Sequence, residues 1–75
     1  MNSKKVIQAL ERAALLFRNA AETAESAADW AKIGRFMSAA QRAEDALWYA
    51  GLATQELKEA LKTLGVKVEG GGKNE

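Results

Sequence analysis

The chain has 75 residues, enough for one small domain near the lower limit of what a single core stabilises. It contains no Cys, Pro or His, which excludes disulfides and removes the commonest metal ligand and general base. Its 11 Lys and Arg residues nearly balance its 10 Asp and Glu residues, which argues against a non-specific nucleic-acid binder. No apolar run has the length of a membrane span and the N-terminus is not a signal peptide, so we expect a cytoplasmic protein.

The first predicted element is a long amphipathic helix over residues 4–33, with Ser3 as its N-cap. Spacings that alternate between four and three residues predict its core-facing positions: Val6, Leu10, Ala13, Phe17, Ala20, Ala24, Ala27 and Ala31. A flanking column recurs every seven residues: Ile7, Ala14, Ala21 and Ala28. Ser26 and Asp29 could instead cap a new short helix, the less favoured alternative. Gly34 is expected to end the helix in the left-handed conformation.

The second predicted helix covers residues 38–64, and the Ser38–Gln41 capping-box pattern opens it. The same alternating spacing predicts its core-facing positions: Ala40, Ala43, Leu47, Ala50, Thr54, Leu57, Leu61 and Leu64. Its flanking column is Ala39, Ala46, Ala53 and Ala60. Gly65 should end the helix in a Schellman cap. Residues 1–69 therefore form one helical domain, and the Gly-rich tail, residues 70–75, is expected to be disordered.

The short connection predicts an all-α fold, an antiparallel hairpin of two long amphipathic helices. Folding about Gly34 brings Phe17 level with Ala50 and Leu10 level with Leu57. A lone hairpin with an Ala-rich interface buries little apolar surface relative to the cost of ordering its chain. We therefore expect the hairpin to assemble into a homo-oligomeric helical bundle.

Trp48, Tyr49 and Leu52 place bulky apolar groups where the rest of the second helix is polar. The hairpin register brings Leu15 and Leu16 of the first helix to the same level, so these residues are predicted to form one apolar belt. Three interpretations remain open. The belt could pack subunits together, capture a protein partner, or form part of a ligand site.

In the ligand interpretation, Trp48 or Tyr49 stacks on a flat base while Arg18 and Arg42 contact phosphate. Surface charges that are solvated or paired explain the same two Arg residues. A second apolar group, Trp30 and Phe36, flanks the predicted turn. It either closes the end of the bundle or forms a second contact surface.

Enzyme chemistry has little support in this sequence, and we assign no catalytic residue, metal site or cofactor. Glu22, Glu25 and Asp29 share a stripe of the first helix, and Glu44 and Asp45 are adjacent on the second. Paired carboxylates can perform acid–base chemistry or hold a divalent ion. No His accompanies them, and carboxylates in metal-binding bundles point inward whereas these point outward.

The segment Arg42-Ala43-Glu44-Asp45-Ala46-Leu47-Trp48-Tyr49-Ala50 resembles the closing helix of a group of small phage-type helical proteins. That group includes sponges for the cyclic-nucleotide signals of bacterial immunity and inhibitors of host regulators. The resemblance implies an oligomeric hairpin with ligand pockets between subunits, and Arg42 is the charged residue that it carries over. We therefore expect a non-enzymatic viral or mobile-element inhibitor of bacterial defence that sequesters a nucleotide second messenger. The alternatives are a helical inhibitor that captures a host protein and a purely structural assembly bundle.

Overall fold

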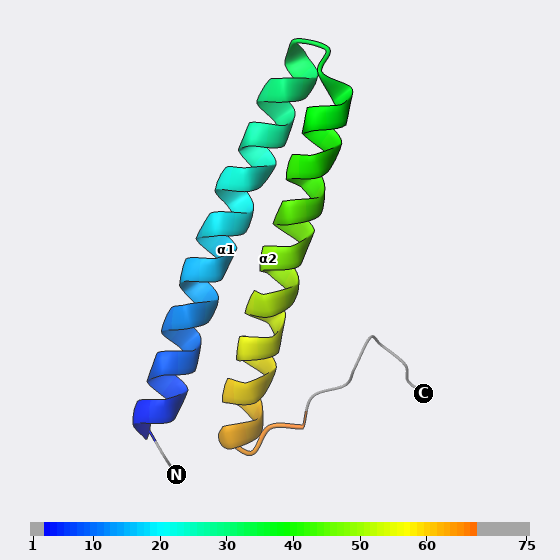
Figure 1. Ribbon diagram of the computed structural model, residues 1–75. Coiled ribbons are helices and arrows are strands. Elements are labelled where there is room, and N and C mark those ends of the chain that lie inside the picture. Colours follow the sequence, from blue (N-terminus) through cyan, green and yellow to red (C-terminus); the bar gives the residue numbers. More distant parts are fainter. Residues whose placement is uncertain (1–2, 68–75) are drawn as a thin grey trace.

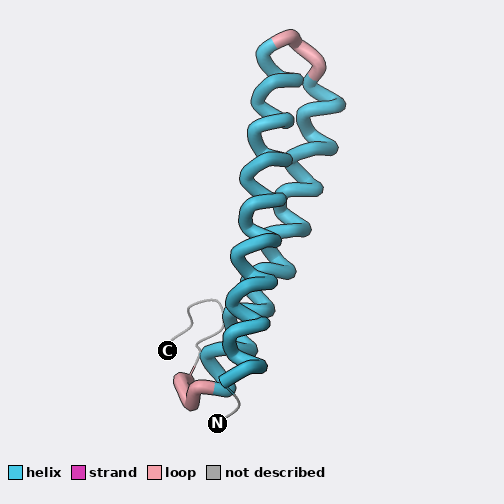
Figure 2. The backbone as a smooth tube through the Cα atoms, turned by 90° about the vertical axis from the view of Figure 1, so that its left-hand side faces the viewer, coloured by secondary structure: helices cyan, strands magenta, loops and turns pink. Residues whose placement is uncertain are grey.

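The structure is a computed structural model that describes residues 3–67 of the 75-residue chain. It contains two α-helices, α1 (Ser3–Lys32) and α2 (Phe36–Thr63). The helices lie side by side and antiparallel, joined by a tight turn at one end (Figure 1). In the view turned by 90°, the helices are offset from each other near the turn and overlap toward the opposite end, so they cross at a shallow angle (Figure 2). The described residues thus confirm the all-α hairpin, whereas the tail predicted to be disordered, residues 70–75, lies outside them.

The turn and the end of α2 both contain a glycine with positive φ. Gly34 has φ 78° and Gly65 has φ 84°, a region that glycine adopts without steric cost. The Arg35 N–H donates to the Trp30 carbonyl at 2.9 Å, and the Val66 N–H donates to the Leu61 carbonyl at 2.9 Å. These bonds satisfy carbonyls that the helix ends leave unpaired, as in a Schellman cap. Both glycine stops predicted from the sequence are therefore confirmed.

The predicted helix starts need correction. Helix α1 already includes Ser3 and continues unbroken through Ser26 and Asp29, so Ser3 is not an N-cap and no second short helix forms. Helix α2 begins at Phe36, two residues before the predicted start, and Arg35 is its N-cap residue without a side-chain capping bond. The Ala39 N–H instead donates to the Arg35 carbonyl at 3.0 Å, so the backbone itself starts this helix.

The interface between the helices, which we call the seam, consists of buried or half-buried residues that recur every three and four positions, except for one gap of seven between Ala39 and Ala46. In α1 these are Val6, Ala9, Ala13, Leu16, Ala20, Thr23, Ala27 and Trp30. In α2 they are Ala39, Ala46, Tyr49, Ala53, Glu56, Ala60 and Thr63. Among residues 3–67 the buried residues are Val6 and four alanines, so close backbone approach, and not large side chains, forms the core.

This seam differs from the predicted one. Leu10, Phe17 and Leu47 were expected to face the opposite helix, but they are 45%, 41% and 74% exposed. The alanine column predicted to flank α2, which includes Ala53 and Ala60, forms the buried interface instead. Small side chains allow two backbones to approach closely, and the larger neighbours are displaced to one side of the contact.

An ion pair across the seam marks the register of the hairpin. The Arg12 guanidinium lies 3.0 Å from an Oε1 atom of Glu56. Counting from this pair, Phe17 lies level with Gly51, and within one residue of Ala50, because the helices are antiparallel and rise equally per residue. The predicted register is therefore right, although each helix is rotated relative to the prediction.

Candidate functional site

Two different surfaces flank the seam. A residue that follows a seam position lies about 100° further round its helix. Because α1 and α2 are antiparallel, the residues that follow seam positions in either helix lie on the same side of the hairpin. Residues that precede seam positions lie on the opposite side. The two sides of the hairpin therefore carry different sets of residues.

The first side, which we call the Phe17 face, is apolar along the entire hairpin. In α1 it consists of Ile7, Leu10, Ala14, Phe17, Ala21, Ala24, Ala28 and Ala31. In α2 it consists of Ala40, Ala43, Leu47, Ala50, Thr54, Leu57, Leu61 and Leu64. Thr54 is its one polar residue, and the hydroxyl of Thr54 donates to the Ala50 carbonyl at 2.8 Å. The face consequently offers hardly any side-chain hydrogen-bonding groups.

The half of the Phe17 face nearer the turn is hollow. Alanines of both helices and Leu47 line a groove of about 490 Å³: Ala20, Ala21, Ala24, Ala27, Ala43, Ala46, Leu47 and Ala50. In the other half the larger side chains stand out from the surface, among them Ile7 at 54% and Leu64 at 42% exposure. The sequence prediction missed this surface because it assumed that large apolar residues face the partner helix. The repeat from Ile7 through Leu10 and Ala14 to Phe17, one residue out of phase with the seam, is the signal that reveals it.

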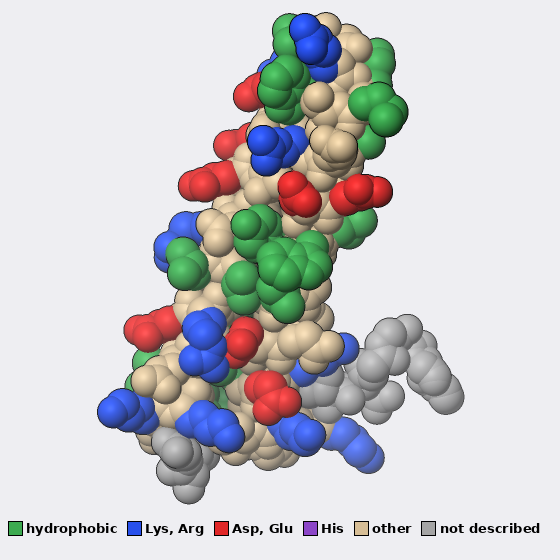
Figure 3. Space-filling model, in the orientation of Figure 1, with side chains coloured by type: hydrophobic (Ala, Val, Ile, Leu, Met, Phe, Trp, Pro, Cys, Tyr) green, Lys and Arg blue, Asp and Glu red, His purple; other side chains and the backbone are tan. Residues whose placement is uncertain are grey.

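The opposite side is polar except in its middle. Leu15 of α1 and Trp48 and Leu52 of α2 interrupt it, with exposed fractions of 55%, 62% and 37%. Figure 3 shows this side, where an apolar patch over both helices has charged side chains above and below it. We call Leu15, Trp48, Tyr49 and Leu52 the Trp48 belt. The exposed belt predicted from the sequence is therefore present, and Leu16, predicted to join it, is half-buried in the seam.

The two aromatic rings of the belt contact each other. The ring centroids of Trp48 and Tyr49 are 5.3 Å apart with an interplanar angle of 63°, an edge-to-face arrangement. Tyr49 is a half-buried seam residue and fixes one edge of this pair, whereas Trp48 projects to solvent. The belt thus combines a held tyrosine with an exposed indole, a rigid apolar group that needs little ordering when it binds.

The four residues expected to hold a nucleotide do not surround one point within a single chain. Arg18 lies level with Tyr49 but follows a residue of the Phe17 face, so it points away from α2. Arg42 lies nearly two turns before Trp48, and its guanidinium is 4.0 Å from a carboxylate oxygen of Asp45. Trp48 and Tyr49 are the two members of the set that the fold brings into contact. The nucleotide site between subunits stays a prediction.

The apolar groups at the turn separate into two environments. Trp30 is half-buried near the end of α1 that leads into the turn. Phe36 and Met37 are 69% and 80% exposed, and Ile33 is 67% exposed. The two residues therefore differ in exposure, and both interpretations of the tip stay predictions.

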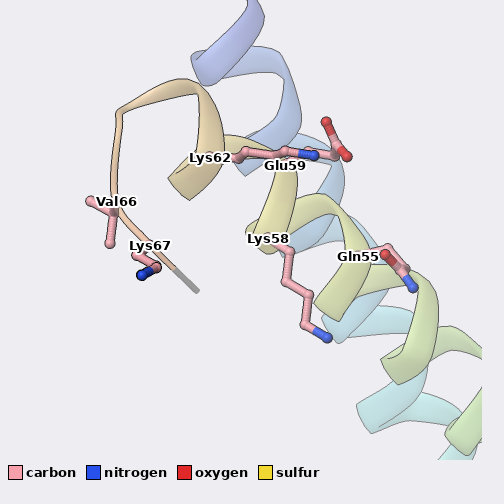
Figure 4. Close-up of a pocket in the computed structure, with 6 residues that line it drawn as sticks. All are labelled: Gln55, Lys58, Glu59, Lys62, Val66 and Lys67. Atoms are coloured by element: carbon pink, nitrogen blue, oxygen red, sulfur yellow. The ribbon is translucent and has the colours of Figure 1, made fainter. Parts of the chain in front are cut away.

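A second depression, of about 410 Å³, lies beside the C-terminal end of α2. Its lining residues are Gln55, Lys58, Glu59, Lys62, Val66 and Lys67. Figure 4 shows that the three lysine side chains point in different directions and do not converge on one point. Glu59 adds a negative charge to the same wall. This arrangement does not concentrate positive charge for an anion.

Within residues 3–67 no group of three or more Asp, Glu, His or Cys side chains is arranged to hold a metal ion. Neither described helix has an apolar stretch long enough to cross a membrane. Comparisons with protein-family models, with curated proteins and with solved structures found no match to this chain. The fold and its surfaces define a two-helix hairpin with an apolar face on one side and an apolar belt on the other.

Proposed function

We propose that this chain is a non-enzymatic binding protein that acts as a homo-oligomer and holds a target on the Trp48 belt. The observation that carries the proposal is the exposure of Trp48, 62%, and of Leu15, 55%, on a side that is otherwise polar. Exposed apolar groups within a polar surface are typical of contact sites, and Trp is a frequent source of binding energy there.

The surroundings of the belt favour a protein as the target. The Arg12–Glu56 pair borders it toward the N-terminus of α1, and the Arg42–Asp45 pair borders it toward the turn. An apolar centre with a rim that carries charges of both signs is the usual composition of a protein–protein interface. The resemblance of residues 42–50 to phage-type hairpins supports a component of bacterial defence, in the host cytoplasm, as that target.

Sequestration of a nucleotide second messenger between subunits is the second candidate. The exposed indole of Trp48 favours it, because a flat aromatic surface that projects to solvent can stack on a base. Arg42 of the same chain and Arg18 of another subunit would then contact phosphate. The Asp45 carboxylate, 4.0 Å from Arg42, lowers the attraction of this site for an anion.

One set of variants separates the two candidates. Native mass spectra of the protein with cyclic dinucleotides, cyclic trinucleotides and ADP-ribose derivatives report a small ligand as a discrete mass addition. A nucleotide site loses this addition in Arg42→Ala while the oligomer persists. A protein site tolerates Arg42→Ala but loses its captured protein in Leu15→Asp.

The matched control is Gln41→Asp, which adds the same charge at an exposed position two turns from Trp48 on the same side. Bacterial proteins retained by the parent and by Gln41→Asp, and lost by Leu15→Asp and Trp48→Ala, would support the belt as the target site. A nucleotide addition that Arg42→Ala abolishes would replace this proposal with the second candidate. Identical capture by all variants, with no nucleotide addition, would overturn both.

A further inference from the structure

We infer that the Phe17 face binds a second copy of this chain in the reverse direction, giving a two-fold symmetric four-helix bundle whose two turns lie at opposite ends. The inference deepens the self-association proposed above and rests on it, but it does not depend on what the Trp48 belt binds. It identifies the interface, the occupant and the orientation of the occupant.

The hairpin alone lacks a core of large side chains. No large side chain among residues 3–67 is fully buried, and four of the five buried residues are alanine. Meanwhile Ile7, Leu10 and Phe17 are between 41% and 54% exposed on one continuous surface. These are the residue types that form cores in other small domains. Their place on a second repeat beside the seam is what a helix of a four-helix bundle requires, since it contacts two neighbours.

The dimensions of the face match those of a stable interface. A helix of 30 residues is about 45 Å long, and two adjacent helices are together about 20 Å wide. The Phe17 face therefore offers roughly 900 Å², close to the ~800 Å² per partner of a standard interface. Its composition is that of an obligate interface, since Thr54 is its one polar residue.

Side-chain size decides the orientation. In α1, large side chains on one side of Phe17 have small side chains at the same distance on its other side. Leu10 and Ala24 are equally far from Phe17, and Ile7 and Ala28 are equally far from it within one residue. In α2 the face is complementary about Ala50, because Leu57 matches Ala43 and Leu61 matches Ala40 within one residue. On both helices, these large residues of the half away from the turn correspond to alanines in the half nearer the turn, whereas Leu47 corresponds to Thr54 within one residue.

The two centres of complementarity coincide. Phe17 and Ala50 lie level with each other within one residue in the register marked by the Arg12–Glu56 pair. One two-fold axis, perpendicular to the helices and running across the Phe17 face at the level of Phe17 and Ala50, therefore satisfies both helices at once. It packs α1 against the α1 helix of the second copy and α2 against the α2 helix of the second copy, each pair antiparallel.

The groove near the turn receives the large side chains in this arrangement. Ala24 and Ala43, which line the groove of about 490 Å³, come level with the second copy's Leu10 and Leu57. A dimer with both turns at the same end instead places Leu10 level with the other copy's Leu57, and alanines level with alanines. One end is then overfilled and the other empty, against the close packing of protein interiors.

Spin labels at the turn measure the orientation directly. The chain has no Cys, and Ile33 is 67% exposed at the turn, so Ile33→Cys accepts one nitroxide per chain. Residue 33 lies about 16 residues from the axis at Phe17, which places the two labels about 48 Å apart at 1.5 Å per residue. A dimer with both turns together holds them within about 25 Å, the width of a four-helix bundle plus label.

Mass measurement and pulsed dipolar spectroscopy separate the possible outcomes. A dimer with a label distance of about 48 Å supports the inference. A dimer with a distance below about 25 Å overturns the orientation and leaves the proposed self-association intact. A monomer at every protein concentration overturns both. None of these outcomes bears on whether the Trp48 belt holds a target.

Two matched variants test the face itself. Leu47→Glu adds a charge on the Phe17 face and Leu15→Glu adds the same charge on the opposite side, and both residues are more than half exposed in the hairpin. With helicity by circular dichroism unchanged in both, we expect Leu47→Glu to be monomeric and Leu15→Glu to remain dimeric. The reverse result would assign the interface to the belt and overturn the inference.

A size exchange gives a second, independent test. Leu10→Ala removes a side chain that fills the groove of the second copy, and we expect the dissociation constant of the dimer to rise by roughly tenfold or more. The double variant Leu10→Ala/Ala24→Leu restores the large–small pair in exchanged positions and should recover most of the affinity. Additive weakening in the double variant would contradict the reversed arrangement.

Discussion

Arg12 and Glu56, 44 residues apart in the chain, form an ion pair of 3.0 Å across the seam. Their side chains are 55% and 27% exposed, so the pair lies in the boundary between protein and solvent. Partly exposed pairs of this kind contribute about 0.2–1 kcal/mol, too little to hold the hairpin together. What the pair provides is position, because it joins the helices at the level that brings Phe17 beside Ala50.

A double-mutant cycle on Arg12→Gln and Glu56→Gln should give a coupling free energy of about 0.2–1 kcal/mol at low salt. The coupling should fall as salt is raised, because the partly exposed charges are screened. Chemical denaturation at two salt concentrations measures it. The pair Lys32 and Asp29, three residues apart within α1, is the control, since its loss should not affect the contact between helices. A coupling above about 2 kcal/mol would mean that the pair is far less solvated than its exposure indicates.

The sequence predicts the two helices, both glycine stops and the register of this hairpin. It fails on the rotation of each helix, for a physical reason. Ala9 and Ala13 are compatible with the core and with the surface, so apolar periodicity alone does not distinguish two adjacent apolar repeats. We expected the larger residues, such as Leu10 and Leu47, to be buried between the helices. The structure buries alanines there because they permit close approach, and this leaves the larger residues for another contact.

The candidate site was also predicted in part: the sequence identifies the apolar belt but not the positions of the arginines. Leu15, Trp48 and Leu52 are apolar residues at positions where their neighbours are polar, so the sequence is enough to identify the belt. The predicted nucleotide site combined Trp48 with Arg18 and Arg42. Whether two surface arginines can reach one ligand depends on the rotation of each helix, which the apolar periodicity did not predict correctly. Arg18 comes two residues after the seam residue Leu16 and so lies on the side of α1 away from α2, and Arg42 lies beside Asp45.

Two glycine substitutions should change stability in opposite directions. Gly34 has φ 78° at the turn, where an alanine is strained, so Gly34→Ala should destabilise the fold by about 1 kcal/mol. Gly51 is inside α2, where alanine is the better helix former, so Gly51→Ala should stabilise it by about 0.5–1 kcal/mol. An added Cβ has no neighbour within 4 Å at either position, which leaves backbone conformation as the cause. Thermal denaturation of the two variants at one protein concentration measures both effects, and equal signs would contradict this account.

Enlarging a seam alanine should be costly. Ala53 is fully buried, and Ala53→Leu forces three additional carbons between the two backbones. We expect a loss of about 1–3 kcal/mol, the usual cost of overpacking a tight core. Gln41→Leu introduces the same side chain at an exposed position of the same helix and should change the unfolding free energy by less than about 0.5 kcal/mol. Urea denaturation compares the two. A tolerated Ala53→Leu would show that α1 and α2 pack through a different set of residues.

The melting temperature itself should depend on protein concentration. A hairpin whose buried residues are Val6 and four alanines has little core of its own, so most of its stability should come from association through the Phe17 face. Mass action then requires the melting temperature to rise as the protein is concentrated, and a monomeric domain shows no such rise. Circular dichroism melts over a hundredfold range of concentration measure this directly.

Leu15→Glu should keep the dependence, because Leu15 lies on the opposite side of the hairpin. Leu47→Glu should lose the dependence and melt at the low temperature of the dilute parent, because the same charge then lies within the interface. A melting temperature that is high and independent of concentration would show that the two helices stabilise each other without a second copy.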